Sequence, residues 1–150
     1  MCIFCRIAAG ELPASIVYED YCTLAFLDIQ PVTQGHMLII PKRHAESFVE
    51  LPPEDASHMM RVAQMLDGAL RWSELRCEAV AIYLADGRAA GQDVHHVFLH
   101  VFPRYQGDGV VLNSDPDSRK HLSREQLNAD ADKIRRALAR IPIPVVNEFV

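Results

Sequence analysis

The residues best suited to chemistry in this sequence lie in the segment GQDVHHVFLHVFPR, residues 91–104. His96 and His100 are four positions apart, and Phe98 stands midway between them. Successive side chains of a β-strand point to opposite faces, so these three residues are expected to share one face. The other face then carries His95, Val97, Leu99 and Val101. A lone histidine in an apolar strand is more often a core residue than a ligand, but the spacing of this pair favours a chemically active face whose middle member is missing.

Two cysteines at the N-terminus, Cys2 and Cys5, form a second group of reactive side chains. A C-x-x-C pair can be a redox couple, half of a metal site or two small core residues. The redox motif is typical of a thioredoxin-like setting after a strand, and this pair lies at the extreme N-terminus instead. Tetrahedral zinc needs two further ligands, so the pair alone leaves a metal site and inert thiols as alternatives. Cys22 and Cys77 are isolated and are expected to be buried.

The elements that position these residues follow an α+β pattern, which we expect to form a single domain over residues 1–150. A polar turn separates the first two expected strands, and a proline follows the third, which indicates a meander. The expected strands cover residues 15–18, 24–28, 36–40, 80–84 and 94–102. Apolar residues recur at helical spacing between Pro53 and Trp72, so one long amphipathic helix is expected there.

A second helix is expected near the C-terminus, because Ser123 and Gln126 have the spacing of a capping box. The apolar stripe of this helix consists of Leu127, Ala131, Ile134 and Leu138. The polar stretch 106–121 is expected to be a surface loop. The apolar tail 145–150 is expected to be either a loose end or a surface that packs on a partner chain.

The composition excludes several classes of protein. Hydrophobic residues make up 49% and charged residues 23% of the chain, which is typical of a globular domain with one core. The formal charge of −5 argues against a general nucleic-acid binder, because such proteins need a basic field to displace counterions. No apolar run approaches the roughly 20 residues of a membrane helix, and Arg6 and Glu11 interrupt any apolar signal segment. We therefore expect a cytoplasmic protein with neither a membrane nor a nucleic acid as partner.

Five segments of the chain resemble, in order, the histidine triad (HIT) family, whose signature is His-x-His-x-His with apolar x, usually after Gly-Gln. They are CIFCRI (2–7), GELPASIVYED (10–20), AFLDIQP (25–31), GHMLIIPKRH (35–44) and GQDVHHVFLHVFPRY (91–105). The resemblance implies an antiparallel sheet of about five strands, one long central helix, a C-terminal helix and a two-fold homodimer. It also implies a pocket for a purine nucleotide, with which the net negative charge is compatible.

The resemblance supplies two further ligands for the cysteine pair. Some HIT proteins complete a zinc site with the histidine that closes the Pro-Lys-x-His segment and with the first histidine of the triad. Those positions are His44 and His96 in this sequence. The resemblance therefore implies a zinc site made of Cys2, Cys5, His44 and His96, with inert thiols as the alternative.

The resemblance also assigns residues to the nucleotide pocket. Asp28 matches an acidic residue that holds the ribose hydroxyls, for which a carboxylate is suited because it accepts two hydrogen bonds. Without the resemblance, Asp28 is an aspartate that closes a strand at a turn. The apolar residues that match the purine site, and that spacing alone would place in the core, are Phe4, Phe26 and Ile29. The residues that match the phosphate site are His36, Gln92 and His100.

Phe98 is the serious departure from the family, because HIT proteins use the middle histidine as the nucleophile that takes a nucleotidyl group. Phenylalanine has no lone pair with which to attack phosphorus. Asp93 and Ala85 are milder departures beside the phosphate site. His95 lies on the opposite strand face, and only a bulge or a register slip would bring it to the site.

Two classes of function follow from this pattern. The first is a HIT-type hydrolase or transferase scaffold, acting on a nucleotide phosphoramidate or a dinucleoside polyphosphate through a covalent histidine intermediate, whose nucleophile position is Phe98. The second is a nucleotide-binding module without a catalytic role. Hydrolysis of a phosphoramidate by a Phe98→His variant distinguishes the two classes.

Overall fold

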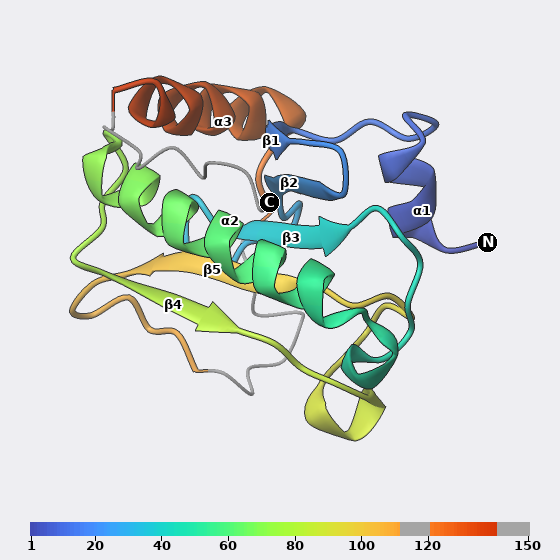
Figure 1. The fold of residues 1–150 in the computed structure, drawn as a ribbon. Helices are drawn as coiled ribbons and strands as arrows, with labels where there is room; N and C mark the ends of the chain where they lie inside the picture. Colours follow the sequence, from blue (N-terminus) through green and yellow to red (C-terminus); the bar gives the residue numbers. More distant parts are fainter. Residues whose placement is uncertain (112–120, 141–150) are drawn as a thin grey trace.

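A computed structural model describes residues 1–111 and 121–140 of the chain. Its centre is an antiparallel sheet with the strand order β1-β2-β3-β5-β4 (Figure 1). The strands are β1 (Ile16–Glu19), β2 (Thr23–Leu27), β3 (Met37–Pro41), β4 (Ala79–Tyr83) and β5 (Leu99–Arg104). The predicted α+β class, the meander of the first three strands and the five-stranded sheet are confirmed.

Two helices pack together on one side of the sheet (Figure 1). α2 (Pro53–Trp72) is the predicted long helix and has a proline in its first turn, where a missing N–H removes no helical hydrogen bond. The buried residues of α2 are Met59, Val62, Ala63, Leu66, Ala69 and Leu70, the predicted stripe. α3 (Arg124–Leu138) contacts α2 and β1, and begins at the predicted capping box, in which Ser123 Oγ accepts the Gln126 N–H.

Apolar side chains cover both faces of the sheet. The larger core joins α2 and α3 to residues such as Leu27, Met37 and Ile39. A smaller cluster on the opposite face consists of Phe4, Leu24, Phe26, Leu38, Ile40 and Phe98. β2 and β3 are buried at every position. Their almost continuously apolar sequences are typical of strands that are covered on both faces. The smaller cluster includes Phe4 of α1 (Ile3–Ala8), a short helix that the sequence analysis did not predict.

The prediction of a strand over residues 94–102 was wrong in its first half. The strand β5 begins at Leu99, because the preceding N–H groups bond elsewhere: His96 N–H donates to Val94 O, and Val97 N–H donates to Ala45 O. The alternation of faces nevertheless continues through residues 97–101. Val97, Leu99 and Val101 belong to the larger core, and Phe98 belongs to the smaller cluster. His95 is exposed, as expected of a histidine that lies away from the site.

Two predictions concern parts of the chain outside the described residues. The expected loop 106–121 is described only at 106–111 and 121, and the expected tail 145–150 is not described. Among the described residues, no helix has both the length and the apolar character needed to cross a membrane.

Candidate functional site

A cavity of about 320 Å³ lies beside the smaller apolar cluster. This volume is at the lower end of the roughly 300–1,000 Å³ typical of small-molecule sites. Its walls come from α1, the end of β2, the segment before β5 and β5 itself. Six of the residues predicted for the nucleotide site line it: Phe4, Phe26, Asp28, Ile29, Phe98 and His100.

Phe98 belongs to an aromatic wall of this cavity. Its side chain is almost fully buried, with ring centroids 5.2 Å from Phe4 and 4.8 Å from His100. Phe4 in turn meets Phe26 at 5.7 Å. Edge-to-face ring pairs contribute about 0.5–1.5 kcal/mol each beyond their buried area. The wall is therefore tightly packed and apolar, and position 98 offers no atom that could act as a nucleophile.

His100 is oriented by hydrogen bonds from the protein interior. Nε2 of His36 and Nδ1 of His100 are 2.8 Å apart, and the Val32 N–H donates to Nδ1 of His36 at 3.2 Å. Since Nδ1 of His36 accepts a hydrogen bond, this network assigns the ring proton to Nε2, which donates to His100. A neutral His100 then carries its own proton on Nε2 and is a donor there. His36 is buried and lies outside the cavity lining, behind His100.

Asp28 stands directly after β2, at the border of the cavity. Its Oδ1 accepts the Gln30 N–H at 2.9 Å, so the residue does close a turn. Its Oδ2 lies 3.6 Å from Nδ1 of His36. The carboxylate thus stabilises the turn, as one interpretation of the sequence expected, and it also lines the cavity.

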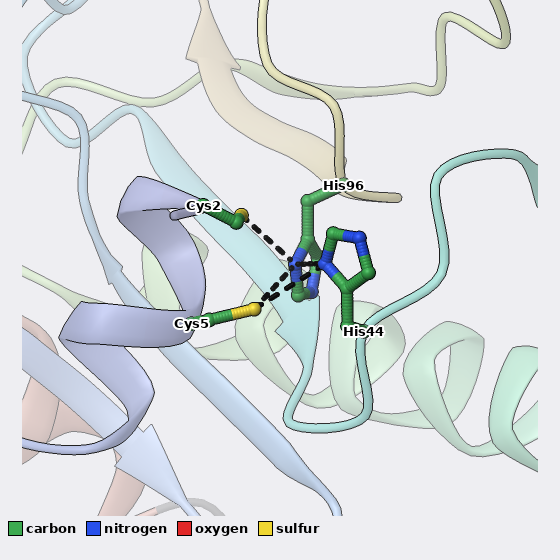
Figure 2. A group of neighbouring side chains, drawn as sticks. All are labelled: Cys2, Cys5, His44 and His96. Atoms are coloured by element: carbon green, nitrogen blue, oxygen red, sulfur yellow. Dashed lines mark hydrogen bonds between the residues drawn. The ribbon is translucent and has the colours of Figure 1, made fainter.

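The four residues of the predicted metal site lie together at the N-terminal end of α1 (Figure 2). Cys2 Sγ is 3.4 Å from Nδ1 of His96, and Cys5 Sγ is 3.3 Å from Nδ1 of His44 and 3.6 Å from Nδ1 of His96. The two Nδ1 atoms are 3.3 Å apart. Four candidate ligand atoms from three distant segments therefore converge on one point.

The second ring nitrogen of His96 is hydrogen-bonded to the backbone, and that of His44 lies near a carboxylate. Nε2 of His96 is 2.8 Å from the Pro41 carbonyl oxygen, to which it donates, and this assigns a lone pair to Nδ1. Nε2 of His44 lies 3.8 Å from Oε1 of Glu46. Burial lowers the pKa of His96, which favours the neutral ring, and burial raises the pKa of the Cys5 thiol. Backbone or carboxylate partners on the outer nitrogen are typical of histidines that bind metals.

Comparison with known proteins identifies the fold and the family. A sequence model of the HIT domain matches residues 9–107, more than half of the chain. The chain belongs to the HIT family. An uncharacterized HIT-like protein of Mycobacterium tuberculosis, Rv1262c, is 46% identical over 122 residues, which cover 77% of this chain and 84% of that protein.

Two other HIT proteins bear on the site. A zinc-bound histidine triad family protein from Mycobacterium smegmatis has a TM-score of 0.80 and 40% identity, covering 92% of this chain and 93% of that chain. Adenosine 5'-monophosphoramidase HNT1 of Candida albicans is 37% identical over 106 residues, which cover 69% of this chain and 70% of that protein. The chain thus has the scaffold of a family with nucleotide hydrolases among its members.

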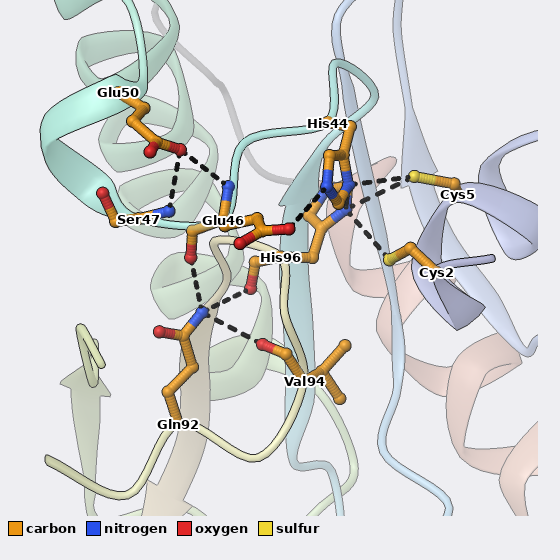
Figure 3. A network of polar contacts seen from close by, with 9 residues as sticks. All are labelled: Cys2, Cys5, His44, Glu46, Ser47, Glu50, Gln92, Val94 and His96. Atoms are coloured by element: carbon orange, nitrogen blue, oxygen red, sulfur yellow. Dashed lines mark hydrogen bonds and ion pairs between the residues drawn. The ribbon is translucent and has the colours of Figure 1, made fainter. Parts of the chain in front are cut away.

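Gln92 takes a different place in this HIT protein from the one expected. Its Nε2 donates to the carbonyl oxygens of Glu46, Val94 and His96 at 2.9–3.1 Å (Figure 3). Its Oε1 accepts the Gly87 N–H at 2.7 Å. The side chain is not among the residues that line the cavity. Its amide groups instead stabilise the loop that leads to Phe98, because they bond to backbone groups on both sides of it. Gln92 therefore holds the backbone before Phe98 and lies outside the lining of this cavity.

Two residues complete the description of the HIT pocket. His95 is exposed and lies outside the lining of the main cavity, so it does not take the place of the missing triad histidine. Arg124, the first residue of α3, does line the cavity. The sequence offered no signal for Arg124, because it follows the cavity's other residues by more than twenty positions and belongs to no motif.

A third group of polar side chains, also missed from the sequence, joins the turn after β1 to α2. Asp20 accepts hydrogen bonds from Tyr18 Oη at 2.8 Å and from the N–H groups of Cys22 and Thr23, and its Oδ2 is 2.6 Å from Nε2 of His58. These bonds satisfy both carboxylate oxygens. The group therefore has a structural role, and Cys22 is partly buried beside it.

Proposed function

We propose that this HIT protein binds a purine mononucleotide, or a derivative of one, in the cavity beside α1. The single observation that carries the proposal is the arrangement of the cavity walls, in which apolar rings stand beside polar groups that include Asp28 and His100. The rings suit the base, the carboxylate suits the ribose hydroxyls, and the imidazole suits a phosphate oxygen. The residues assigned to binding are Phe4, Phe26, Asp28, Ile29 and His100, with His36 and Gln92 positioning them.

The same proposal describes the chain as a HIT hydrolase or transferase scaffold, of the phosphoramidate or dinucleoside polyphosphate class, without its nucleophile. In that reaction an imidazole nitrogen attacks the α-phosphorus, the amine or second nucleotide leaves, and water then hydrolyses the phosphorus–nitrogen bond. Phe98 cannot form that bond. His100, the other triad residue at the cavity, already accepts a hydrogen bond from His36 at Nδ1. We therefore propose a protein that binds nucleotides and has lost, or never used, this hydrolysis.

We propose zinc as the metal held by Cys2, Cys5, His44 and His96. With Zn–S about 2.3 Å and Zn–N about 2.0–2.1 Å, tetrahedral ligands stand about 3.3–3.4 Å apart for two nitrogens and about 3.5–3.6 Å for sulfur and nitrogen. The corresponding separations here are 3.3 Å and 3.3–3.6 Å. The donor set and its spacing therefore fit zinc.

The role proposed for this zinc is structural. All four ligands come from the protein, which leaves no open position for a substrate. Bound zinc would link α1 to the loop of His44 and to the segment of His96, and so stabilise the wall that Phe4 contributes to the cavity. Thiolates of this kind need a reducing compartment, which supports the cytoplasm as the proposed location.

A homodimer is proposed through the outer strand β4. The other outer strand, β1, contacts α3, whereas β4 has exposed side chains that include the large apolar Ile82. Two copies related by a two-fold axis can pair β4 with β4 and extend the sheet. Light scattering that gives the mass of one chain, 16.9 kDa, contradicts this assignment.

Isothermal calorimetry of the unmodified, zinc-loaded chain with AMP tests the proposed function. We expect saturable binding of one nucleotide per chain. At about 1 mM AMP, even a weak site with a binding free energy of about −4 kcal/mol is half filled. The proposal is contradicted if the chain retains its zinc and its thermal transition and yet shows no heat of binding at that concentration.

A further inference from the structure

Arg124 adds a positive charge to a cavity whose other lining side chains are apolar, acidic, imidazole or, at Gln30, amide groups. Among the described residues that line the cavity, it is the one arginine or lysine. It comes from α3, which lies outside the residues 9–107 that match the HIT domain. The positive charge at the cavity therefore comes from a residue outside the matched segment.

A hydrogen bond holds Arg124 at one end of the cavity. Its Nη1 donates to Ser15 Oγ at 3.0 Å, and that hydroxyl donates in turn to Oδ1 of Asn128 at 2.7 Å. Ser15 is buried, and its carbonyl oxygen accepts the Leu27 N–H at 3.0 Å. The anchor of the guanidinium is thus part of the framework where β1 begins and β2 ends.

The sheet places this end of the cavity far from the phosphate end. Ser15 directly precedes β1, and His100 lies in β5. Three steps between neighbouring strands separate β1 from β5 in the order β1-β2-β3-β5-β4. At about 4.8 Å a step, the two strands are about 14 Å apart. A nucleotide with its phosphate at His100 and its ribose at Asp28 therefore extends its base toward Arg124.

We propose that Arg124 is a specificity-determining residue that recognises the O6 and N7 edge of a 6-oxopurine, guanine or hypoxanthine, in preference to adenine. Arginine presents five N–H donors in a planar fork, and one Nη1 donor is used by Ser15. O6 and N7 form a pair of acceptors that such a fork binds in a bidentate manner. Adenine offers the N7 acceptor but has an amino group at position 6. This amino group is a hydrogen-bond donor, so it would face a guanidinium donor with no acceptor between them. The inference rests on the proposed nucleotide function.

Calorimetry with GMP, IMP and AMP tests this inference on the full, zinc-loaded chain. GMP and IMP are expected to bind roughly tenfold more tightly than AMP. This factor lies toward the lower end of the discrimination typical of a bidentate pair, because Arg124 is exposed. IMP lacks the 2-amino group of guanine, so its agreement with GMP isolates the O6 and N7 contact. Equal affinities for all three nucleotides overturn the inference and leave the proposed function intact, whereas no binding of any nucleotide overturns both.

Three variants assign the preference to the guanidinium fork. Arg124→Gln is expected to bring the three affinities together, whereas Arg124→Lys, whose ammonium can still donate to O6 and N7 but lacks the fork, is expected to keep part of the preference. Arg136→Gln is the matched control, since it removes the same charge from an exposed position of the same helix. A 6-oxopurine preference that persists in Arg124→Gln, or a loss that also occurs in Arg136→Gln, overturns the inference. Thermal melts of each variant verify that α3 is still folded.

Discussion

Phe4 packs edge-on against Phe98, with ring centroids 5.2 Å apart and ring planes at 80°. Phe4 lies between Cys2 and Cys5 in the sequence, so the same short helix supplies two candidate metal ligands and one wall of the cavity. The ring of Phe4 also touches that of His96, a third candidate ligand, with centroids 5.8 Å apart. The candidate metal site and the cavity therefore share a wall, and a change in one is expected to alter the other.

The first prediction concerns metal content and stability. Cys5→Ala removes one of four ligands and is expected to lower both the bound zinc, from about one per chain, and the melting temperature, because structural zinc contributes on the order of 10 kcal/mol in small peptides. Elemental analysis and thermal unfolding measure the two effects. Cys22→Ala, which alters a partly buried thiol outside the group, is the control and should keep its zinc. A metal-free native chain in which Cys2 and Cys5 both titrate as free thiols contradicts the zinc assignment.

The second prediction concerns the coupling of metal to nucleotide. Removal of zinc by a chelator is expected to weaken AMP binding by about 1 kcal/mol, the lower end of typical coupling energies, because α1 loses its attachment and Phe4 its fixed position. Calorimetry before and after chelation, at a temperature where the chain stays folded, measures this change. Re-addition of zinc should restore the affinity. Identical affinities with and without metal would show that α1 is held by apolar packing alone.

The third prediction concerns the ribose contact. Asp28→Ala is expected to weaken AMP binding by roughly 1–3 kcal/mol, because hydrogen bonds to a buried carboxylate are charge-assisted. A nucleotide without the two ribose hydroxyls should bind the unmodified chain weakly and should show little further loss with Asp28→Ala. Asp67→Ala, in a surface ion pair of α2, is the matched control. Equal losses for both nucleotides would indicate that Asp28 acts only through its turn.

The fourth prediction concerns the missing nucleophile. Phe98→His is expected to lower stability by about 1.5–3 kcal/mol, because it replaces a buried apolar ring with one that water prefers to hydrate. It is also expected to create hydrolysis of an adenosine phosphoramidate, since removing a nucleophile from another enzyme lowered turnover about a million-fold. Phe98→Leu, which changes packing and adds no lone pair, is the control.

The outcomes of this experiment separate the two functional classes. A Phe98→His chain that binds AMP and stays inactive supports a binding module without a catalytic history. Restored hydrolysis supports the silenced enzyme scaffold. Robust activity in the unmodified chain that His95→Ala abolishes contradicts both, because His95 lies outside the cavity lining.

The fifth prediction concerns acid stability. Burial alone would raise the pKa of Asp20, but hydrogen bonds from His58, Tyr18 and two backbone N–H groups outweigh it and hold the pKa below its usual 3.8. A lowered folded pKa means that this group stabilises the fold above the unfolded value and that the contribution is lost as the pH falls through the folded pKa. Asp20→Asn should therefore lower the stability of the fold at pH 7. Below about pH 4 the variant should lose less stability than the unmodified chain does. Urea unfolding at several pH values measures this dependence of stability on pH, with Asp67→Asn as the control. Parallel curves of stability against pH for Asp20→Asn and the unmodified chain would contradict the prediction.

Local patterns in the sequence determined much of the fold. The helix stripe from Met59 to Leu70 and the Ser123 capping box depend on neighbours three or four positions away, so both were predictable without knowledge of the rest of the chain. The HIT segments also named the cavity residues and the four candidate metal ligands. The start of β5 was missed because the alternation of faces extends beyond the hydrogen-bonded strand, and periodicity reports only the faces.

Only the tertiary structure decided which atoms meet. Cys2 and His96 are 94 positions apart, and no local pattern encodes the 3.4 Å between their ligand atoms. Gln92 and His36 lie outside the cavity lining because side-chain amides and imidazoles bond to whichever groups the fold brings within reach, here backbone carbonyls and a second histidine. Arg124 reaches the cavity because α3 packs beside β1. The sequence by itself determines which residues can do chemistry, and long-range packing determines which of them face the same space.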